Sequence, residues 1–102
     1  MSHRHTITWT VGKKNKVTIT PQIVNKGDDI QIDTSAAKAP IAVFFPDKSL
    51  TGKHQYLLQP GVATPIKIKA QRDQWTVFTY AAYFEEYHEF AEGSSPIIIV
   101  RP

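Results

Sequence analysis

Most of the residues of this chain that could do chemistry lie in one short acidic and aromatic segment near the C-terminal end. Residues 88–92, His-Glu-Phe-Ala-Glu, differ from the His-Glu-x-x-His motif of zinc proteases by a glutamate in place of the second histidine. On a helix, His88 and Glu92 would share one face and could hold Zn²⁺, with Glu89 as the general base. Glu85-x-x-His88 is also half of a di-iron carboxylate pattern, which needs partner helices. One such match in a short chain is weak evidence, and a solvated acidic segment is the simpler interpretation.

Other signatures of catalysis are missing from the sequence. The chain has no cysteine, and its single methionine is Met1. No Ser/His/Asp order, glycine-rich phosphate loop or nucleotide-binding fingerprint is present. We therefore expect a protein that is not an enzyme and that carries no cofactor.

A non-blue metal site is the alternative that the sequence leaves open. Spacing along the chain says little about which side chains meet in a β-fold, so distant histidines could converge on one ion. Imidazole and carboxylate groups suit Cu(II), Zn²⁺ and Ni²⁺. The alternative ligand set is His54, His88 and Glu92.

The elements that would position these residues are short β-strands. Residues 6–11 alternate strictly, with Ile7, Trp9 and Val11 on one face, which is typical of a half-buried strand. Turn residues separate further runs of this kind at 17–20, 23–24, 29–33, 40–45, 65–69, 75–80 and 96–100. We expect two hairpins, 6–11 with 17–20 and 23–24 with 29–33. Such short strands predict a single all-β domain over residues 1–102, an antiparallel β-sandwich.

The predicted core contains the apolar residues on the inward faces of these strands. They are Ile7, Trp9, Val17, Ile19, Ile30, Ile32, Val43, Ile66, Ile68, Val77, Phe78, Ile97 and Ile99. One segment departs from the alternation. Between residues 80 and 92 the aromatic side chains recur at a spacing of three to four, which predicts a short amphipathic helix in the 81–92 loop.

Three parts of the pattern occur in an order known from one family. Residues 19–30, Ile-Thr-Pro-Gln-Ile-Val-Asn-Lys-Gly-Asp-Asp-Ile, resemble the Pro-x-x-Ile/Val and Lys-Gly-Asp-x-Val pattern of cupredoxins. Residues 58–61, Leu-Gln-Pro-Gly, resemble its Leu-x-Pro-Gly turn. Residues 77–80, a loop and residues 96–100 resemble its strand, copper loop and last strand. The resemblance covers residues 17–102 and implies a cupredoxin-like Greek-key β-sandwich.

The copper site that this resemblance implies has no ligands here. In cupredoxins a histidine opens the strand that matches residues 41–44, and no histidine stands at 40–44. The cysteine would follow the aromatic strand, where this chain has Ala81 and Ala82. His88 stands where a loop histidine is found, but no methionine follows it. Because a type-1 copper centre needs a soft thiolate, this chemistry is excluded.

The charge is unevenly distributed along the chain. The net charge is +3, yet eleven of the twelve Lys and Arg residues precede residue 80 and all four glutamates follow it. The lysines are mostly scattered, whereas a nucleic-acid site needs clustered cations and interleaved aromatics, so we expect no nucleic-acid partner. The acidic 85–92 segment would repel a phosphate backbone or dock weakly on the basic face of a second copy. The sequence leaves weak self-association of this kind open and does not determine the oligomeric state.

The sequence gives conditional expectations for location. No apolar run approaches the roughly 18 residues needed to cross a bilayer, so we expect no membrane span. The first residues contain no apolar stretch typical of a secretory signal. We expect a cytoplasmic protein if the chain is full length, and a periplasmic or extracellular one if it is an excised mature domain.

The preferred functional hypothesis is a binding module for a protein or small ligand. The scaffold resembles a cupredoxin whose copper loop is replaced by an aromatic and acidic segment, and loops of such folds commonly carry recognition. The residues expected at the binding surface are Tyr83, Phe84, Tyr87, His88 and Phe90.

Overall fold

The computed structural model describes residues 3–92 and 96–102, and its regular elements are β-strands and two short 3-10 turns. The first sheet has the order β1 (Arg4–Ile7), β5 (Asp29–Ile32), β8 (Ile66–Lys67). The second has the order β11 (Glu89–Phe90), β10 (Ala81–Phe84), β6 (Ile41–Phe44), β7 (Gln55–Leu58). The third has the order β4 (Gln22–Val24), β12 (Ile97–Val100), β9 (Thr76–Thr79). No helix in the described ranges combines the length and apolar character needed to cross a membrane.

A hairpin of β2 (Trp9–Val11) and β3 (Val17–Ile19) completes the strands. The 3-10 turn η1 (Lys13–Asn15) lies between the two strands, and Trp9 faces Ile19 across the pair. The predicted hairpin of residues 6–11 with 17–20 is confirmed for residues 9–11 and 17–19, whereas residues 6 and 7 belong to β1, which pairs with β5. The expectation of an all-β protein is confirmed as well, and the arrangement is compatible with a β-sandwich.

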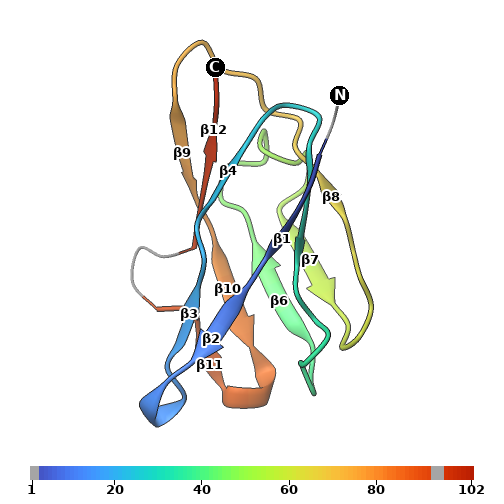
Figure 1. The fold of residues 1–102 in the computed structure, drawn as a ribbon, viewed down its shortest axis with the longest axis vertical. Coiled ribbons are helices and arrows are strands. Elements are labelled where there is room, and N and C mark those ends of the chain that lie inside the picture. Colours follow the sequence, from blue (N-terminus) through green and yellow to red (C-terminus); the bar gives the residue numbers. More distant parts are fainter. Residues whose placement is uncertain (1–2, 93–95) are drawn as a thin grey trace.

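The second and third sheets share one outer face, because β9 continues into β10 with only Tyr80 between them (Figure 1). Burial alternates without a break along this double strand: Phe78, Tyr80, Ala82 and Phe84 are buried, whereas the residues between them are more exposed. A β-strand places alternate side chains on opposite faces. Val77 and Tyr83 therefore lie on the same side of the molecule.

Two strand pairs correct the expectation of a purely antiparallel sandwich. β1 runs parallel to β5, and β4 runs parallel to β12. The predicted hairpin between residues 23–24 and 29–33 is wrong for the same reason. The turn at 25–28, where Gly27 has a φ of 91°, leads from β4 in the third sheet to β5 in the first instead of folding the chain back on itself.

The core follows the sequence prediction closely along most strands. Nine of the thirteen predicted residues are buried: Ile7, Val17, Ile19, Ile30, Ile32, Val43, Ile66, Ile68 and Phe78. Val77 is the clear error, since its side chain is 58% exposed. Trp9, Ile97 and Ile99 are only half-buried. In the last strand Ile98 and Val100 point inward, and a run apolar at every position could not show which alternate set does so.

The prediction of a helix in the 81–92 loop is wrong for most of this segment. Residues 81–84 and 89–90 form the antiparallel pair β10 and β11, and only η2 (Glu85–Tyr87) is a single 3-10 turn. Ala82 and Phe84 point into the core while Ala81 and Tyr83 point outward, which is the period of a strand. Aromatic residues favour strands, and the cross-strand pair of Tyr83 and Phe90 stabilises this one.

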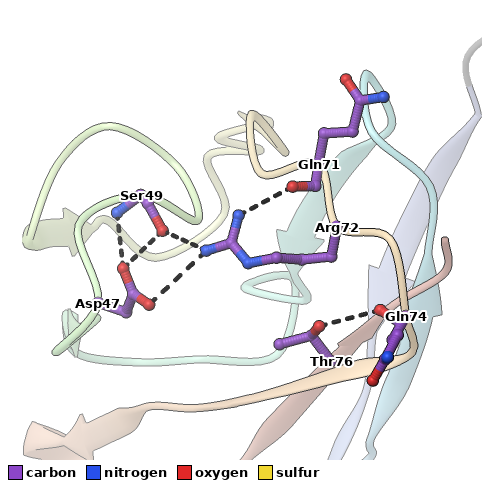
Figure 2. Close-up of polar contacts among 6 residues, drawn as sticks. All are labelled: Asp47, Ser49, Gln71, Arg72, Gln74 and Thr76. Carbon is purple, nitrogen blue, oxygen red and sulfur yellow. Dashed lines mark hydrogen bonds and ion pairs between the residues drawn. The ribbon is translucent and has the colours of Figure 1, made fainter.

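Arg72 attaches the long loop between β6 and β7 to the segment that precedes β9 (Figure 2). Its guanidinium donates hydrogen bonds to Oγ of Ser49 (2.8 Å) and to the carbonyl of Gln71 (3.0 Å), and it lies 3.9 Å from a carboxylate oxygen of Asp47. Asp47 in turn accepts hydrogen bonds from the hydroxyl and the N–H of Ser49, which lower its pKa. The loop held in this way delivers Lys53 and His54 to the start of β7.

Candidate binding site

A groove of about 660 Å³ lies on the outer face of the second sheet. It falls within the size range of small-molecule sites, roughly 300–1,000 Å³. The lining residues come from β6, β7, β10, β11 and the loop before β7. They are Ala42, Val43, Phe44, Lys53, Gln55, Tyr56, Leu57, Ala81, Tyr83 and Phe90.

The groove exists because small and large side chains alternate on neighbouring strands. Across the sheet, Tyr83 lies opposite Ala42, and Ala42 lies opposite Leu57. Two residues further along, and on the same face, Ala81 lies opposite Phe44. The alanine methyl groups leave the surface low at these two points, while the larger neighbours stand around them. The hollow is therefore a product of strand register.

The groove surface is strongly apolar and open to solvent. Leu57 is 63% exposed and Phe90 is 60% exposed, and Phe44 is also exposed. Val77 and Ile23 lie on the same outer face, since both are opposite Ile99 of the third sheet. Five of the eight exposed large apolar side chains in the described ranges thus share one face. Three of them, Phe44, Leu57 and Phe90, line the groove itself, and exposed apolar side chains gathered in this way mark interaction sites in soluble proteins.

Polar groups are few in the groove, and its charged residue precedes β7. Of its ten lining residues, all within the described ranges, Lys53 alone is charged. Its Nζ lies 5.0 Å from the ring centroid of Tyr56, within cation–π distance. The His54 ring stacks on Phe44 at 5.7 Å, and its Nδ1 is 2.8 Å from the carbonyl oxygen of Phe45. These contacts place one cation beside an aromatic wall.

The structure separates the five residues that the sequence placed at a binding surface. Tyr83 and Phe90 line the groove, with ring centroids 4.9 Å apart.

The other three residues lie outside the groove. Phe84 is only 2% exposed and packs on Trp9 at 4.8 Å. Tyr87 also faces Trp9, at 6.3 Å. His88 is exposed beyond η2, at the left-handed φ of 52°, with Nδ1 3.9 Å from Glu85. The helical spacing had put inward and outward residues on one face.

The three alternative metal ligands lie on three different segments of the fold. His54 lies on the loop before β7, His88 follows η2, and the N–H of Glu92 donates to the carbonyl of Val17. Within residues 3–92 and 96–102, no group of three or more His, Asp or Glu side chains is placed to hold a metal ion.

Most groove residues were missed by the sequence analysis. Residues 40–45 are apolar on both faces, so their alternation did not show that Phe44 points outward. Leu57 lies in β7, which is outside every strand that the sequence predicted. The usable signal was the pair Ala42 and Ala81, small residues in strands otherwise rich in large ones.

No family model matches this chain, and no curated protein matches it either.

Proposed function

We propose that this protein is a non-enzymatic binding module that takes an apolar ligand group into the groove between β7, β6 and β10. The observation that carries the proposal is the gathering of exposed apolar side chains around a hollow whose floor contains two alanines. Apolar pockets with a few convergent polar groups are the usual form of a ligand site. Lys53 at the rim favours a ligand with an anionic group beside its apolar body.

The scaffold in this proposal is cupredoxin-like and of Greek-key type, without a type-1 copper site. It is supported by the sequence resemblance over residues 17–102 and by the all-β architecture with several sheets. Because fold alone does not determine function, the functional argument depends on the groove and not on the family resemblance.

The proposal is tested with anilinonaphthalene sulfonate, a fluorescent probe that combines an apolar body with one anionic group. We expect saturable binding to the wild-type protein, with amide NMR shifts concentrated at Ala42, Leu57 and Ala81. Ala42→Gln fills the floor with a neutral side chain and should weaken binding by about tenfold, equivalent to about 1.4 kcal/mol.

Val62→Gln is the matched control, because Val62 is also an exposed apolar residue but does not line the groove. Equal weakening in both variants, or no saturable binding to wild type, would contradict the proposal. Thermal unfolding of each variant shows whether it is folded under the conditions of the titration.

A further inference from the structure

β7 is an edge strand with a free hydrogen-bonding side. It pairs with β6, and no other strand in the described ranges pairs with it. The N–H of Phe45 donates to the carbonyl of His54 (2.7 Å), and these residues are directly opposite in the register that pairs Phe44 with Gln55. Hydrogen-bonded pairs alternate along an antiparallel ladder. The backbone N–H and C=O groups of Gln55 and Leu57 therefore point away from β6.

This edge lacks the features that usually prevent pairing with another chain. Proteins protect edges with proline, charged residues or bulges. The β7 sequence, Gln-Tyr-Leu-Leu, contains no proline and no charge, and its register with β6 is regular over four pairs. The outward side chains of Gln55 and Leu57 are both exposed. The edge is therefore open to a further strand.

The free edge and the groove are adjacent. Gln55 and Leu57 present their backbone groups to the edge and their side chains to the groove lining. In a strand added beside β7, alternate side chains would lie on the outer face next to Leu57. Main-chain hydrogen bonds would thus supply affinity, and the groove would select an apolar side chain.

The charge around the start of β7 indicates the composition of such a strand. The loop of residues 46–54 contains Lys48 and Lys53, and Nζ of Lys69 lies beside Gly52. The single acidic residue of the loop, Asp47, is engaged by Ser49 and lies near Arg72. A peptide that carries Asp or Glu next to its apolar residues would be complementary to this end of the edge.

We propose that β7 accepts an extended peptide of acidic and apolar residues as an additional strand, with an apolar side chain of the peptide in the groove. This inference rests on the proposed function of the groove and names the class of its ligand. It requires no movement of β6 or β10, because the edge groups already point outward.

The test uses a blocked seven-residue peptide of sequence Asp-Val-Thr-Phe-Thr-Val-Asp with wild-type protein. We expect saturable binding by fluorescence anisotropy and slower amide hydrogen exchange at Gln55 and Leu57. A peptide with lysine in place of both aspartates should bind about tenfold more weakly, as should one that is N-methylated at alternate residues along one edge. Both comparisons use the unaltered protein.

Protein variants address the edge directly. Gln55→Pro removes an N–H that faces away from β6, a position at which an edge strand tolerates proline. Gln55→Ala makes a similar side-chain change but keeps the N–H. The peptide should bind the proline variant about tenfold more weakly than the alanine variant. If the proline variant does not fold, the N-methylated peptide gives the same comparison.

The outcomes separate this inference from the proposed function. Probe binding in the groove without any peptide binding would overturn strand addition alone, and failure of both would overturn both. Equal binding of the N-methylated and unmodified peptides would also overturn strand addition. A dimer by light scattering that Gln55→Pro dissociates would show that a second copy occupies the edge, contrary to the inference.

Discussion

The Nε2 atom of His5 donates a hydrogen bond to the carboxylate of Asp28 over 2.8 Å, and this contact joins β1 to the turn before β5. The same carboxylate accepts the N–H groups of Asn25 (2.9 Å) and His3 (3.0 Å). Asp28 is 1% exposed, so its charge lies in the interior with three donors around it. A buried carboxylate requires such partners. Asp28 thus closes the 25–28 turn and holds β1 beside β5.

Asp28→Asn should lower the free energy of unfolding by about 1–3 kcal/mol. An amide offers one acceptor oxygen where the carboxylate offers two, so at least one of the three donors around Asp28 loses its partner. Urea unfolding followed by tryptophan fluorescence measures the change. Asp29→Asn is the control: Asp29 is partly exposed, 3.7 Å from Lys67, and such a surface pair is worth less than about 1 kcal/mol. Equal losses in the two variants would contradict the role given to Asp28.

The stability of the protein should fall with acid in a window set by Asp28. Burial raises the pKa of Asp28, but hydrogen bonds from Asn25, His5 and His3 outweigh it and bring the pKa to about 2, from the ordinary 3.8. Since the folded pKa is below the unfolded one, ionised Asp28 stabilises the fold above about pH 4, and this contribution is lost as the pH falls towards 2. The difference in pKa corresponds to about 2 kcal/mol.

Unfolding free energies of wild type and Asp28→Asn between pH 7 and pH 2 test this window. The difference between the two proteins should be constant above pH 5 and should shrink below pH 4. The comparison isolates Asp28 from Asp33 and Asp47, whose pKa values are also lowered by hydrogen bonds from neighbouring serines. Curves that stay parallel down to pH 2 would mean that Asp28 is not the group responsible.

Alternation along the chain predicted the all-β fold and most of the core, because one face of each strand is apolar and the other polar. It failed where both faces are apolar, as in residues 96–100, and could not assign Ile98 to the interior. It also could not predict pairing between distant strands. Nothing in β4 indicates that its partner is β12. The turn residues at 25–28 are those of a hairpin, yet β5 pairs with β1 and β8 and not with β4.

The groove was less accessible to sequence reasoning than the fold. The aromatic residues Tyr83 and Phe90 were identified, but their partners Phe44 and Leu57 come from strands far away in the sequence. The hollow at Ala42 beside Tyr83 can be predicted only if the register between β6 and β10 is known. Register depends on the whole sheet, so the residues of one strand do not encode it.

Tyr80 should tolerate replacement by phenylalanine better than an average buried residue. Its hydroxyl is buried and has no hydrogen-bond partner in the described part of the chain, and its ring packs on Phe45 at 5.2 Å. Tyr80→Phe keeps the ring and removes the unsatisfied group, so the free energy of unfolding should stay the same or rise by about 1 kcal/mol. Chemical denaturation tests this, and a loss above about 1 kcal/mol would reveal a partner for the hydroxyl.

Burial also raises the pKa of the Tyr80 phenol. An ultraviolet titration of the folded protein should therefore show a tyrosine component that ionises at a higher pH than an ordinary phenol does. This component of the titration should be missing in Tyr80→Phe. If Tyr80→Phe instead removes a phenol that ionises at the ordinary tyrosine pKa, the buried position of Tyr80 is contradicted.

Divalent metal ions should bind weakly to this protein. The ligand set His54, His88 and Glu92 comes from three separate segments, and no group of three potential ligand side chains in residues 3–92 and 96–102 is placed around a common point. Calorimetric titration of untagged protein with Zn²⁺, Cu²⁺ or Ni²⁺ should show no site tighter than about 10 μM, equivalent to about 7 kcal/mol. A tighter site that is lost in both His54→Ala and His88→Ala would restore the metal-binding alternative.

Tyr83→Ala should impair binding and Tyr87→Ala should impair stability, although both residues belong to the same aromatic segment. Tyr83 lines the groove with Phe90, whereas Tyr87 is half-buried and packs against Trp9. Tyr83→Ala should therefore weaken binding of anilinonaphthalene sulfonate by several-fold and cost less than about 1 kcal/mol of stability. Tyr87→Ala should cost about 1–2 kcal/mol of stability because it removes packing on Trp9. If both variants bind the probe equally weakly under conditions in which both are folded, the binding surface would be the whole 83–90 segment and not the groove.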